Sequence, residues 1–251
     1  MTTLHQKSSA SMLAWLNLIV ILSVIAWNYY SNTASINGNT VGSLSEEYAN
    51  LFTPAGFAFS IWGLIFLGLI ALGIYLIKNS GPSDSHPNMI QTICKFLIPA
   101  NLLNAAWLWF WLNEYTLVTV FTIFSTLFFL IKLLLVLSDA KTPISYWIKV
   151  PVALYAGWIT VASIANVSAY LAKIYVELPI SDVAACVILI ISAGLINVLM
   201  LRRTRSFVYV LVGVWALLAI SYRHWGDLPM LSYVGVGTSL VLLGFVVKGR
   251  L

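Results

Sequence analysis

The chain has 251 residues, of which 61% are hydrophobic and only 8% are charged, and its mean hydropathy is +0.94. An ordinary soluble domain is about 25% charged, so these few charges cannot cover a surface that faces water. The formal net charge of +5 lies mainly in short segments between apolar runs, which is typical of membrane orientation and argues against nucleic-acid binding. The composition therefore predicts a protein embedded in a lipid bilayer.

Eight apolar segments follow one another along the chain, and each is long enough to cross the hydrocarbon region of a bilayer as a helix. They cover residues 12–30, 57–77, 95–113, 116–137, 147–171, 183–201, 206–222 and 230–247. These runs do not alternate with the two-residue period of a membrane barrel strand. We therefore predict an all-α fold, a polytopic transmembrane bundle of about eight spans.

The first segment, 12–30, has a second interpretation as a signal peptide, because Lys7 precedes its apolar stretch. The segment ends, however, in a Trp-Asn-Tyr-Tyr run, which is typical of a helix end at the membrane interface. The next connection, 31–56, is the longest and is rich in Ser, Asn, Thr and Gly. It is long enough to fold over the mouth of the bundle as a lid, and a plain solvated connector is the alternative. Residues 79–88 are interpreted as a flexible linker.

The loop charges predict the orientation. If the N-terminus lies inside, 11 of the 13 Lys and Arg residues fall on the inner side and only Lys173 and Arg223 fall outside. Six of the eight acidic residues fall outside. By the positive-inside rule, both termini are expected on the cytoplasmic side of a multi-pass integral membrane protein. A bacterial plasma membrane is the location that we expect.

Ionisable side chains are missing from the middle of the predicted spans, although such residues mark proton relays and other functional sites in membrane proteins. The three histidines, His5, His86 and His224, lie in loops or in the N-terminal tail, so no metal site is predicted. Cys94 and Cys186 fall at opposite membrane faces in this topology, and no disulfide is expected between them. The sequence predicts neither catalytic residues nor an enzyme.

Aromatic residues gather on single faces of three spans, and two of these faces also carry an amide at their edge. Residues three, four, seven or eight positions apart align on one helix face. The three faces are Phe59, Trp62 and Phe66; Asn104, Trp107 and Trp111; and Trp158, Ala162 and Asn166. Such faces could line an apolar pocket for a flat hydrophobic ligand. Ordinary aromatic packing, with the amides joining neighbouring helices, is the alternative.

At these residues the chain resembles the TspO family of tryptophan-rich sensory proteins, also called translocator proteins or peripheral-type benzodiazepine receptors. Three segments carry the resemblance, in the family's order: Pro54-Ala-Gly-Phe-Ala-Phe-Ser-Ile-Trp62, Leu103-Asn104-Ala-Ala-Trp107 and Tyr155-Ala-Gly-Trp158-Ile-Thr-Val-Ala162-Ser-Ile-Ala-Asn166. One departure is Ala100, which stands where the family usually has a glutamine. The resemblance divides the chain into a five-helix core at 12–172 and a three-helix extension at 183–247.

The resemblance implies a bundle that encloses a hydrophobic pocket beneath its first loop. Members of the family bind tetrapyrroles and sterol-like lipophiles and are linked to regulation, transport or photo-oxidative breakdown of porphyrins. By position, it implies these pocket residues: Trp62, Asn104, Trp107, Trp158, Ala162 and Asn166. Phe59 and Phe66 join them from the first aromatic face. Tyr170 and Lys173 also fit a short sterol-contact pattern, with an interfacial tyrosine and a snorkelling lysine as the alternative.

The expected function is therefore that of a membrane binding, transport or sensory protein for a flat hydrophobic ligand, a tetrapyrrole or a sterol-like lipid. No cofactor is required, although a porphyrin or lipid is expected as a bound ligand, and a haem iron would receive no axial histidine from the core helices. One alternative is a structural membrane subunit that packs against a protein or pigment partner. A second is a uniporter or exporter of a lipophile without ion coupling. A homo-oligomer or a membrane-protein partner is compatible with each.

Overall fold

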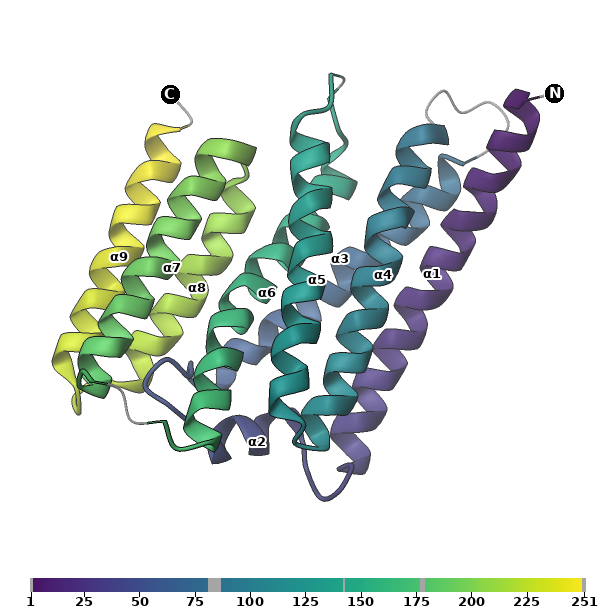
Figure 1. The fold of residues 1–251 in the computed structure, drawn as a ribbon. Helices are drawn as coiled ribbons and strands as arrows, with labels where there is room; N and C mark the ends of the chain where they lie inside the picture. The colour runs from purple at the N-terminus through teal and green to yellow at the C-terminus, as the bar shows by residue number, and fades with distance from the viewer. Residues whose placement is uncertain (1, 81–86, 142, 177–178, 250–251) are drawn as a thin grey trace.

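In the computed structural model, described for residues 2–80, 87–141, 143–176 and 179–249, the elements are helices (Figure 1). They are α1 (Thr2–Ala34), α2 (Val41–Glu47), the 3-10 helix η1 (Gly56–Ser60), α3 (Ile61–Lys78), α4 (Pro87–Leu112), α5 (Thr116–Ser138), α6 (Tyr146–Lys173), α7 (Asp182–Thr204), α8 (Phe207–Arg223) and α9 (Pro229–Lys248). The described part holds only an isolated bridge between Ile36 and Asn39 and no named strand. The all-α prediction is confirmed.

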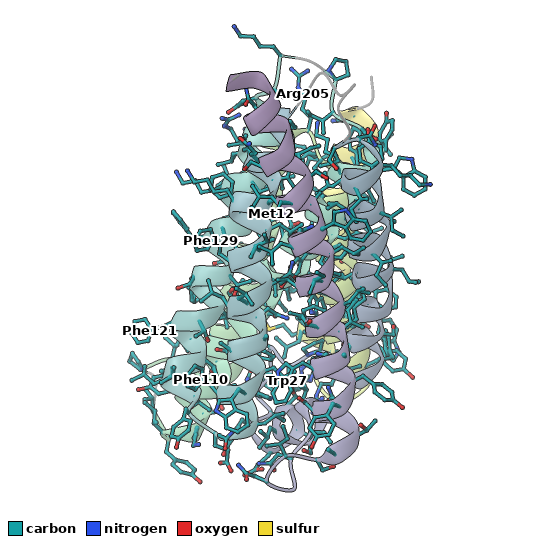
Figure 2. All side chains as sticks on the ribbon, turned by 90° about the vertical axis from the view of Figure 1, so that its right-hand side faces the viewer. Met12, Trp27, Phe110, Phe121, Phe129 and Arg205 are labelled. Carbon is teal, nitrogen blue, oxygen red and sulfur yellow. The ribbon has the colours of Figure 1, made fainter. Side chains whose placement is uncertain are left out.

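The helices stand side by side, with both chain termini at one end of the bundle and α2 at the other (Figure 1). We call these the terminal end and the lid end. Among the described residues, seven helices are long and apolar enough to cross a membrane, and α8 is a shorter apolar helix. Its 17 residues rise about 25 Å, close to the lower limit for a span. Apolar side chains such as Met12 and Phe121 project from the outer faces of the bundle (Figure 2). Such side chains are expected on a surface that contacts lipid.

Two helices begin earlier than the sequence predicted. The first starts at Thr2 instead of residue 12, and α4 starts at Pro87 instead of residue 95. Apolar composition detects only the part of a helix inside the hydrocarbon, whereas both helices continue through polar residues beyond it. Proline is also favoured in the first turn of a helix. The predicted linker 79–88 is thus shorter, and its residues 81–86 lie outside the described part of the chain.

Helix α6 is the centre of the bundle. About 67% of its most apolar stretch is buried, against 28–39% for the other six long spans, because it packs against α3, α5 and α8. On one side of it, α1 packs against α3 and α4; on the other, α8 and α9 pack together and α9 also contacts α7. The helix that carries the third aromatic face therefore has protein on most sides.

The extension joins the core mainly through the contact between α6 and α8. Gly157 allows this close approach, since a Cβ atom there would lie 3.0 Å from the Tyr209 carbonyl oxygen and 3.0 Å from the Val212 Cβ. Three residues after Gly157 on α6, the Thr160 hydroxyl lies 2.7 Å from the Tyr209 hydroxyl. One continuous apolar core includes residues from both parts of the chain. The division into two units at 172 and 183 stays a prediction.

Replacing Gly157 with leucine should therefore loosen the docking of the extension. The new side chain would meet backbone and a β-branched residue, which no change of rotamer can clear. Overpacking of this kind costs about 1–3 kcal/mol, which lowers the melting temperature of a protein of this size by about 2–12 °C. Gly244→Leu is the matched control, because no atom lies within 4 Å of a Cβ at that position. Equal melting temperatures for the two variants in detergent would contradict the assignment of this contact.

At the terminal end, α5 and α7 are joined directly. The Arg203 guanidinium donates hydrogen bonds of 2.7 and 2.6 Å to the two carboxylate oxygens of Asp139. This pairing lowers the pKa of the Asp139 carboxyl. Beside it, the Ser138 hydroxyl donates to the Thr204 carbonyl oxygen at 3.3 Å. The two helices are thus tied together where α5 ends.

Candidate functional site

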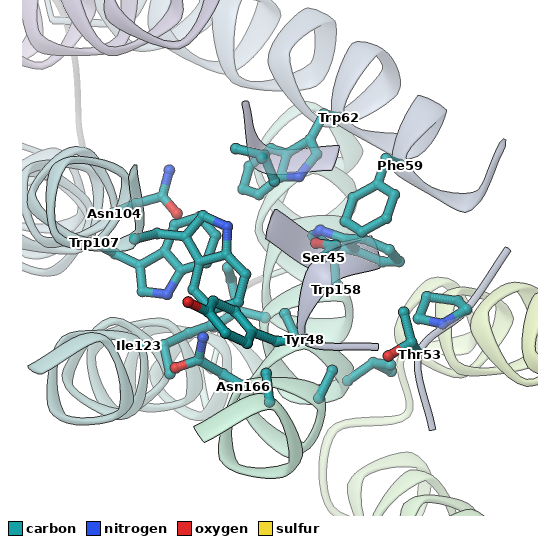
Figure 3. Close-up of a pocket in the computed structure, with 18 residues that line it drawn as sticks. Ser45, Tyr48, Thr53, Phe59, Trp62, Asn104, Trp107, Ile123, Trp158 and Asn166 are labelled. Carbon is teal, nitrogen blue, oxygen red and sulfur yellow. The ribbon is translucent and has the colours of Figure 1, made fainter. Parts of the chain in front are cut away.

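A cavity lies at the lid end of the core, between α3, α4, α5 and α6, and residues 35–55 cover it (Figure 3). We call residues 35–55 the lid. The cavity is lined by Val41, Ser45, Tyr48, Thr53, Pro54, Phe59, Trp62, Asn104, Trp107, Trp111, Ile123, Trp158, Ile159, Val161, Ala162, Ala165, Asn166 and Ala169. Tyr48 is the one ionisable residue among them. The cavity is therefore mostly apolar and is covered by the lid.

Seven of the eight residues predicted to bind the ligand line this one cavity. They are Phe59, Trp62, Asn104, Trp107, Trp158, Ala162 and Asn166. Phe66 does not line it. Its ring packs against Trp62 at 5.2 Å, about one turn further from the lid along α3, because a shared helix face continues past the floor of the cavity. That these residues bind a ligand stays a prediction.

The lid contributes lining residues that the sequence reading missed. Helix α2 has only seven residues, too few for a helical period to be recognised. A local signal was present: the Thr40 hydroxyl accepts from the Ser43 backbone N–H at 3.1 Å, while the Ser43 hydroxyl accepts from the Thr40 backbone N–H at 2.8 Å. This reciprocal pair is a capping box. It places Ser45 and Tyr48 over the cavity. The lid interpretation of segment 31–56 thus fits the structure better than a plain connector.

The walls of the cavity consist of paired aromatic rings. Phe59 meets Trp158 edge to face at 5.9 Å, and Trp107 stacks on Trp111 at 5.6 Å with only 15° between the ring planes. Edge-to-face and offset-stacked pairs each add about 0.5–1.5 kcal/mol beyond their buried area. Flat ring faces from α4 and α6, together with η1, therefore border the same space (Figure 3).

Three buried polar atoms in the lining have no hydrogen-bond partner among the described residues: the indole nitrogens of Trp107 and Trp111, and the side-chain oxygen of Asn166. An unpaired buried donor or acceptor costs about 1–3 kcal/mol. A ligand that brought an acceptor to the indole N–H groups and a donor to the amide oxygen would remove that cost. The chemistry of the lining thus fits an apolar molecule with a few polar atoms at its edge.

The cavity has little free space in this structure, because its volume is only about 70 Å³. Pockets for drug-sized ligands are typically about 300–1,000 Å³. A large ligand therefore requires the lid to lift or the stacked rings of Trp107 and Trp111 to separate.

On the core side, the lid is held by a cluster around Glu114. The Tyr48 hydroxyl donates to the Glu114 carboxylate, and Lys173 donates to the Glu114 carbonyl at 2.7 Å and lies 3.3 Å from its carboxylate. The Lys173 ammonium also lies 5.2 Å from the centre of the Tyr48 ring. The hydrogen bond from Tyr48, followed by that from Lys173, lowers the pKa of Glu114, whereas burial and Glu114 raise the pKa of Tyr48.

This cluster bears on the predicted lipid contact at Tyr170 and Lys173. Lys173 is only partly exposed and its ammonium is engaged by Glu114, so the lysine is directed toward the lid. Tyr170 is half-buried one turn earlier on α6. The contact of these two residues with a sterol-like lipid stays a prediction. The pairing of Lys173 with Glu114 could not be predicted from local spacing, because the partners are 59 residues apart.

On the other side, the extension holds the lid. The Arg223 guanidinium, at the end of α8, donates two hydrogen bonds of 2.8 and 2.7 Å to the Glu46 carboxylate. The His224 Nε2 lies 2.8 Å from the Leu51 carbonyl oxygen, and the Ala55 backbone N–H donates to the Ala219 carbonyl oxygen at 3.2 Å. The lid is therefore anchored both to the core and to the extension.

Acidification should loosen the lid on its extension side. The hydrogen bonds from Arg223 hold the pKa of the Glu46 carboxyl below its usual 4.5. Because the folded pKa is lower than the unfolded pKa, the stabilisation is complete above about pH 4.5 and is lost as the pH falls through the folded pKa. Amide exchange of residues 41–48, normalised to its intrinsic rate, should therefore rise below that pH.

The control for this pH effect is Glu46→Gln, which removes the titrating group. Its lid should already exchange faster at neutral pH and should show a weaker rise on acidification. A part of the rise will remain, because Glu114 also titrates from a lowered pKa on the core side of the lid. Identical pH profiles for the two proteins would mean that the pair of Glu46 and Arg223 does not hold the lid.

A comparison with known protein families bears on the whole chain. The family model described as "TSPO-like protein" matches residues 14–248. The chain belongs to the TSPO-like family. The match runs through α7, α8 and α9 as well as the core, so the extension is part of what the family describes. Comparisons with curated proteins and with solved structures found no match.

Membership in the TSPO-like family agrees with the architecture described above. Together with the seven long apolar helices of the described chain, it establishes an integral, multi-pass membrane protein whose helix bundle lies in a lipid bilayer. The family also indicates a role in ligand binding, transport or sensing at the membrane. Within the described residues, no three His, Cys, Asp or Glu side chains lie together as a metal site would need. The two cysteines, Cys94 and Cys186, are buried and free.

Proposed function

We propose that this TSPO-like protein binds a flat hydrophobic ligand, a tetrapyrrole or a sterol-like lipid, in the cavity beneath the lid. The observation that carries the proposal is the lining itself, in which paired aromatic rings surround three buried polar atoms without partners among the described residues. Packing alone would leave those atoms unsatisfied at a cost. A binding role explains why they are retained.

Each part of the lining has a distinct task in this proposal. The rings of Phe59, Trp107 and Trp158 provide flat apolar area for stacking. A carbonyl or carboxylate oxygen at the ligand edge accepts from the indole N–H groups of Trp107 and Trp111. A hydroxyl of the ligand donates to the Asn166 side-chain oxygen. Stacking on the flat faces of the ligand thus provides the binding contacts, and the hydrogen bonds at its edge fix its orientation.

Binding in this proposal follows movement of the lid, because the present volume of the cavity, about 70 Å³, is too small for a tetrapyrrole. By the distribution of Lys and Arg, the terminal end is cytoplasmic and the lid lies on the opposite side of the membrane. The ligand then enters from that side. The role is one of binding, with transport or sensing as its consequence, and not of catalysis, since no acid–base pair faces the cavity among the described lining residues.

The test is a titration of the detergent-purified protein with protoporphyrin IX, followed by tryptophan fluorescence quenching and by the porphyrin spectrum. A lipophile of similar size but different shape controls for partitioning into the micelle. Saturable, shape-selective binding is the expected result. A signal that rises without saturation, equally for both compounds, would refute the proposal for tetrapyrroles, and the same titration with a sterol would then decide the second ligand class.

A further inference from the structure

A second hollow lies at the lid end, between α6 and α7, separate from the cavity beneath the lid. Its volume is about 1,140 Å³, and it opens to the surface. The walls are formed mainly by apolar side chains, among them Phe124, Ile164, Leu171 and Leu189. Polar groups, including Asp182 of α7 and Arg223 of α8, line it as well. We call this hollow the groove.

The groove exists because the extension is attached unevenly. At the terminal end, the bidentate pair of Arg203 and Asp139 and the bond from Ser138 tie α7 to α5. Helix α6 packs instead on α8, through the contacts at Gly157 and Thr160. The groove between α6 and α7 is lined only by their halves nearest the lid, by residues 164–172 of α6 and 182–189 of α7.

We propose that the groove binds one acyl chain of a phospholipid from the membrane leaflet at the lid end. The depth of the groove supports this occupant. Its wall on α6 runs from Ile164 to Ala172, a rise of about 12 Å. The hydrocarbon core of a bilayer is about 30 Å thick, so the groove spans most of one leaflet.

The distribution of polarity supports the same occupant. The apolar walls lie at the depth of the hydrocarbon core. A water molecule there would find few hydrogen-bond partners, and if the groove were empty its wall atoms would lose dispersion contacts on one side. The charged groups of the groove come from the ends of α7 and α8, at the level of lipid headgroups. They carry both signs, Asp182 against Arg223, and Arg223 is already paired with Glu46. This rim favours a zwitterionic headgroup over an anionic one.

The proposal is independent of the proposed function, because the groove and the cavity beneath the lid share no lining residue. The test uses the full chain in nanodiscs of phosphatidylcholine that contain a small share of the same lipid with a diazirine in one acyl chain. After photolysis, labelled peptides are identified by mass spectrometry. A diazirine near the headgroup should label the first turn of α7, and one near the chain end should label the region of Ile164 and Leu189.

Two variants fill the groove from opposite walls: Ser168→Trp on α6 and Ala185→Trp on α7. Both should lose the labelling of the groove. Gly237→Trp is the matched control, because it places the same side chain on α9 where no atom lies within 4 Å of a Cβ, and it should label like the parent protein. Trp158→Ala, in the cavity beneath the lid, should also keep the labelling, which separates this inference from the proposed function.

Three results would overturn the inference. The first is labelling of the parent protein spread evenly over the lipid-facing sides of the helices, without concentration at the groove. The second is labelling that does not move along α6 and α7 when the diazirine moves along the chain. Both are read from the parent protein and do not depend on the folding of a variant. The third is a cross-link from the groove to a second copy of the chain in place of lipid.

Discussion

Replacing Trp158 with alanine should weaken the binding of protoporphyrin IX by at least about tenfold, or about 1.4 kcal/mol. The Trp158 ring is only 3% exposed, lines the cavity, and meets Phe59 edge to face. Its removal takes away one aromatic wall of the cavity and leaves the Phe59 ring without its aromatic partner. The measurement is the dissociation constant from tryptophan quenching and from the porphyrin spectrum.

Loss of a buried tryptophan can also destabilise a protein by about 3–5 kcal/mol, so a second variant separates binding from folding. Ala162→Phe fills the cavity from a half-buried position and should weaken binding without removing any packed side chain. Trp147→Ala is the control, because Trp147 is 61% exposed near the other end of the same helix. Trp215 is unsuitable as a control, since its indole N–H donates to the Ala58 carbonyl at 3.1 Å beside the cavity wall.

These three variants give a clear decision. Weaker binding to Ala162→Phe and Trp158→Ala, with unchanged binding to Trp147→Ala, supports the cavity as the binding site. If the filled and the emptied cavity both bind the porphyrin as the parent protein does, the ligand binds elsewhere and the assignment of the site is wrong.

Replacing Arg223 with glutamine should release the lid on its extension side and accelerate ligand association. The substitution removes a bidentate ion pair with Glu46 whose side chains are 24% and 58% exposed. Exposed pairs contribute about 0.2–1 kcal/mol, and the upper value corresponds to about a fivefold change in the population of the open lid. Stopped-flow quenching should show faster association, and residues 41–48 should exchange their amide hydrogens faster.

The matched control for Arg223→Gln is Arg203→Gln. Arg203 forms a bidentate pair of the same kind with Asp139, but at the terminal end of the bundle, far from the lid. This control should leave the association rate and the exchange of residues 41–48 unchanged. Equal acceleration in both variants would indicate a general loss of stability, and no acceleration in either would mean that the lid does not limit ligand access.

Much of the fold could be predicted because apolar length is a direct physical requirement of a membrane span. The eight predicted segments correspond to α1 and α3–α9. The extra turns of α1 and α4 could not be predicted from hydropathy, since their polar residues lie beyond the hydrocarbon. The short helix α2 was missed because seven residues establish no period, and its formation depends on capping at Thr40 and on contacts with distant parts of the chain.

The candidate cavity could be predicted in part for a similar reason. Helical spacing brings Trp158, Ala162 and Asn166 to one face whatever the rest of the chain does. Spacing cannot say where along a helix face a cavity ends, and Phe66 lies on the predicted face of α3 but beyond the residues that line the cavity. The pairs of Glu114 with Lys173 and of Glu46 with Arg223 join residues 59 and 177 positions apart. No local pattern in a single sequence reports such partners.

The close contact at Gly157 has a consequence for assembly. Small residues on a membrane helix usually mark a face where another helix approaches, and in this chain α8 already occupies that face of α6. A second copy of the protein therefore cannot pair through it. Any homodimer must form through helices on the periphery, such as α1 or α9, whose outer faces carry exposed apolar side chains, and its two cavities would then be separated by at least one intervening helix.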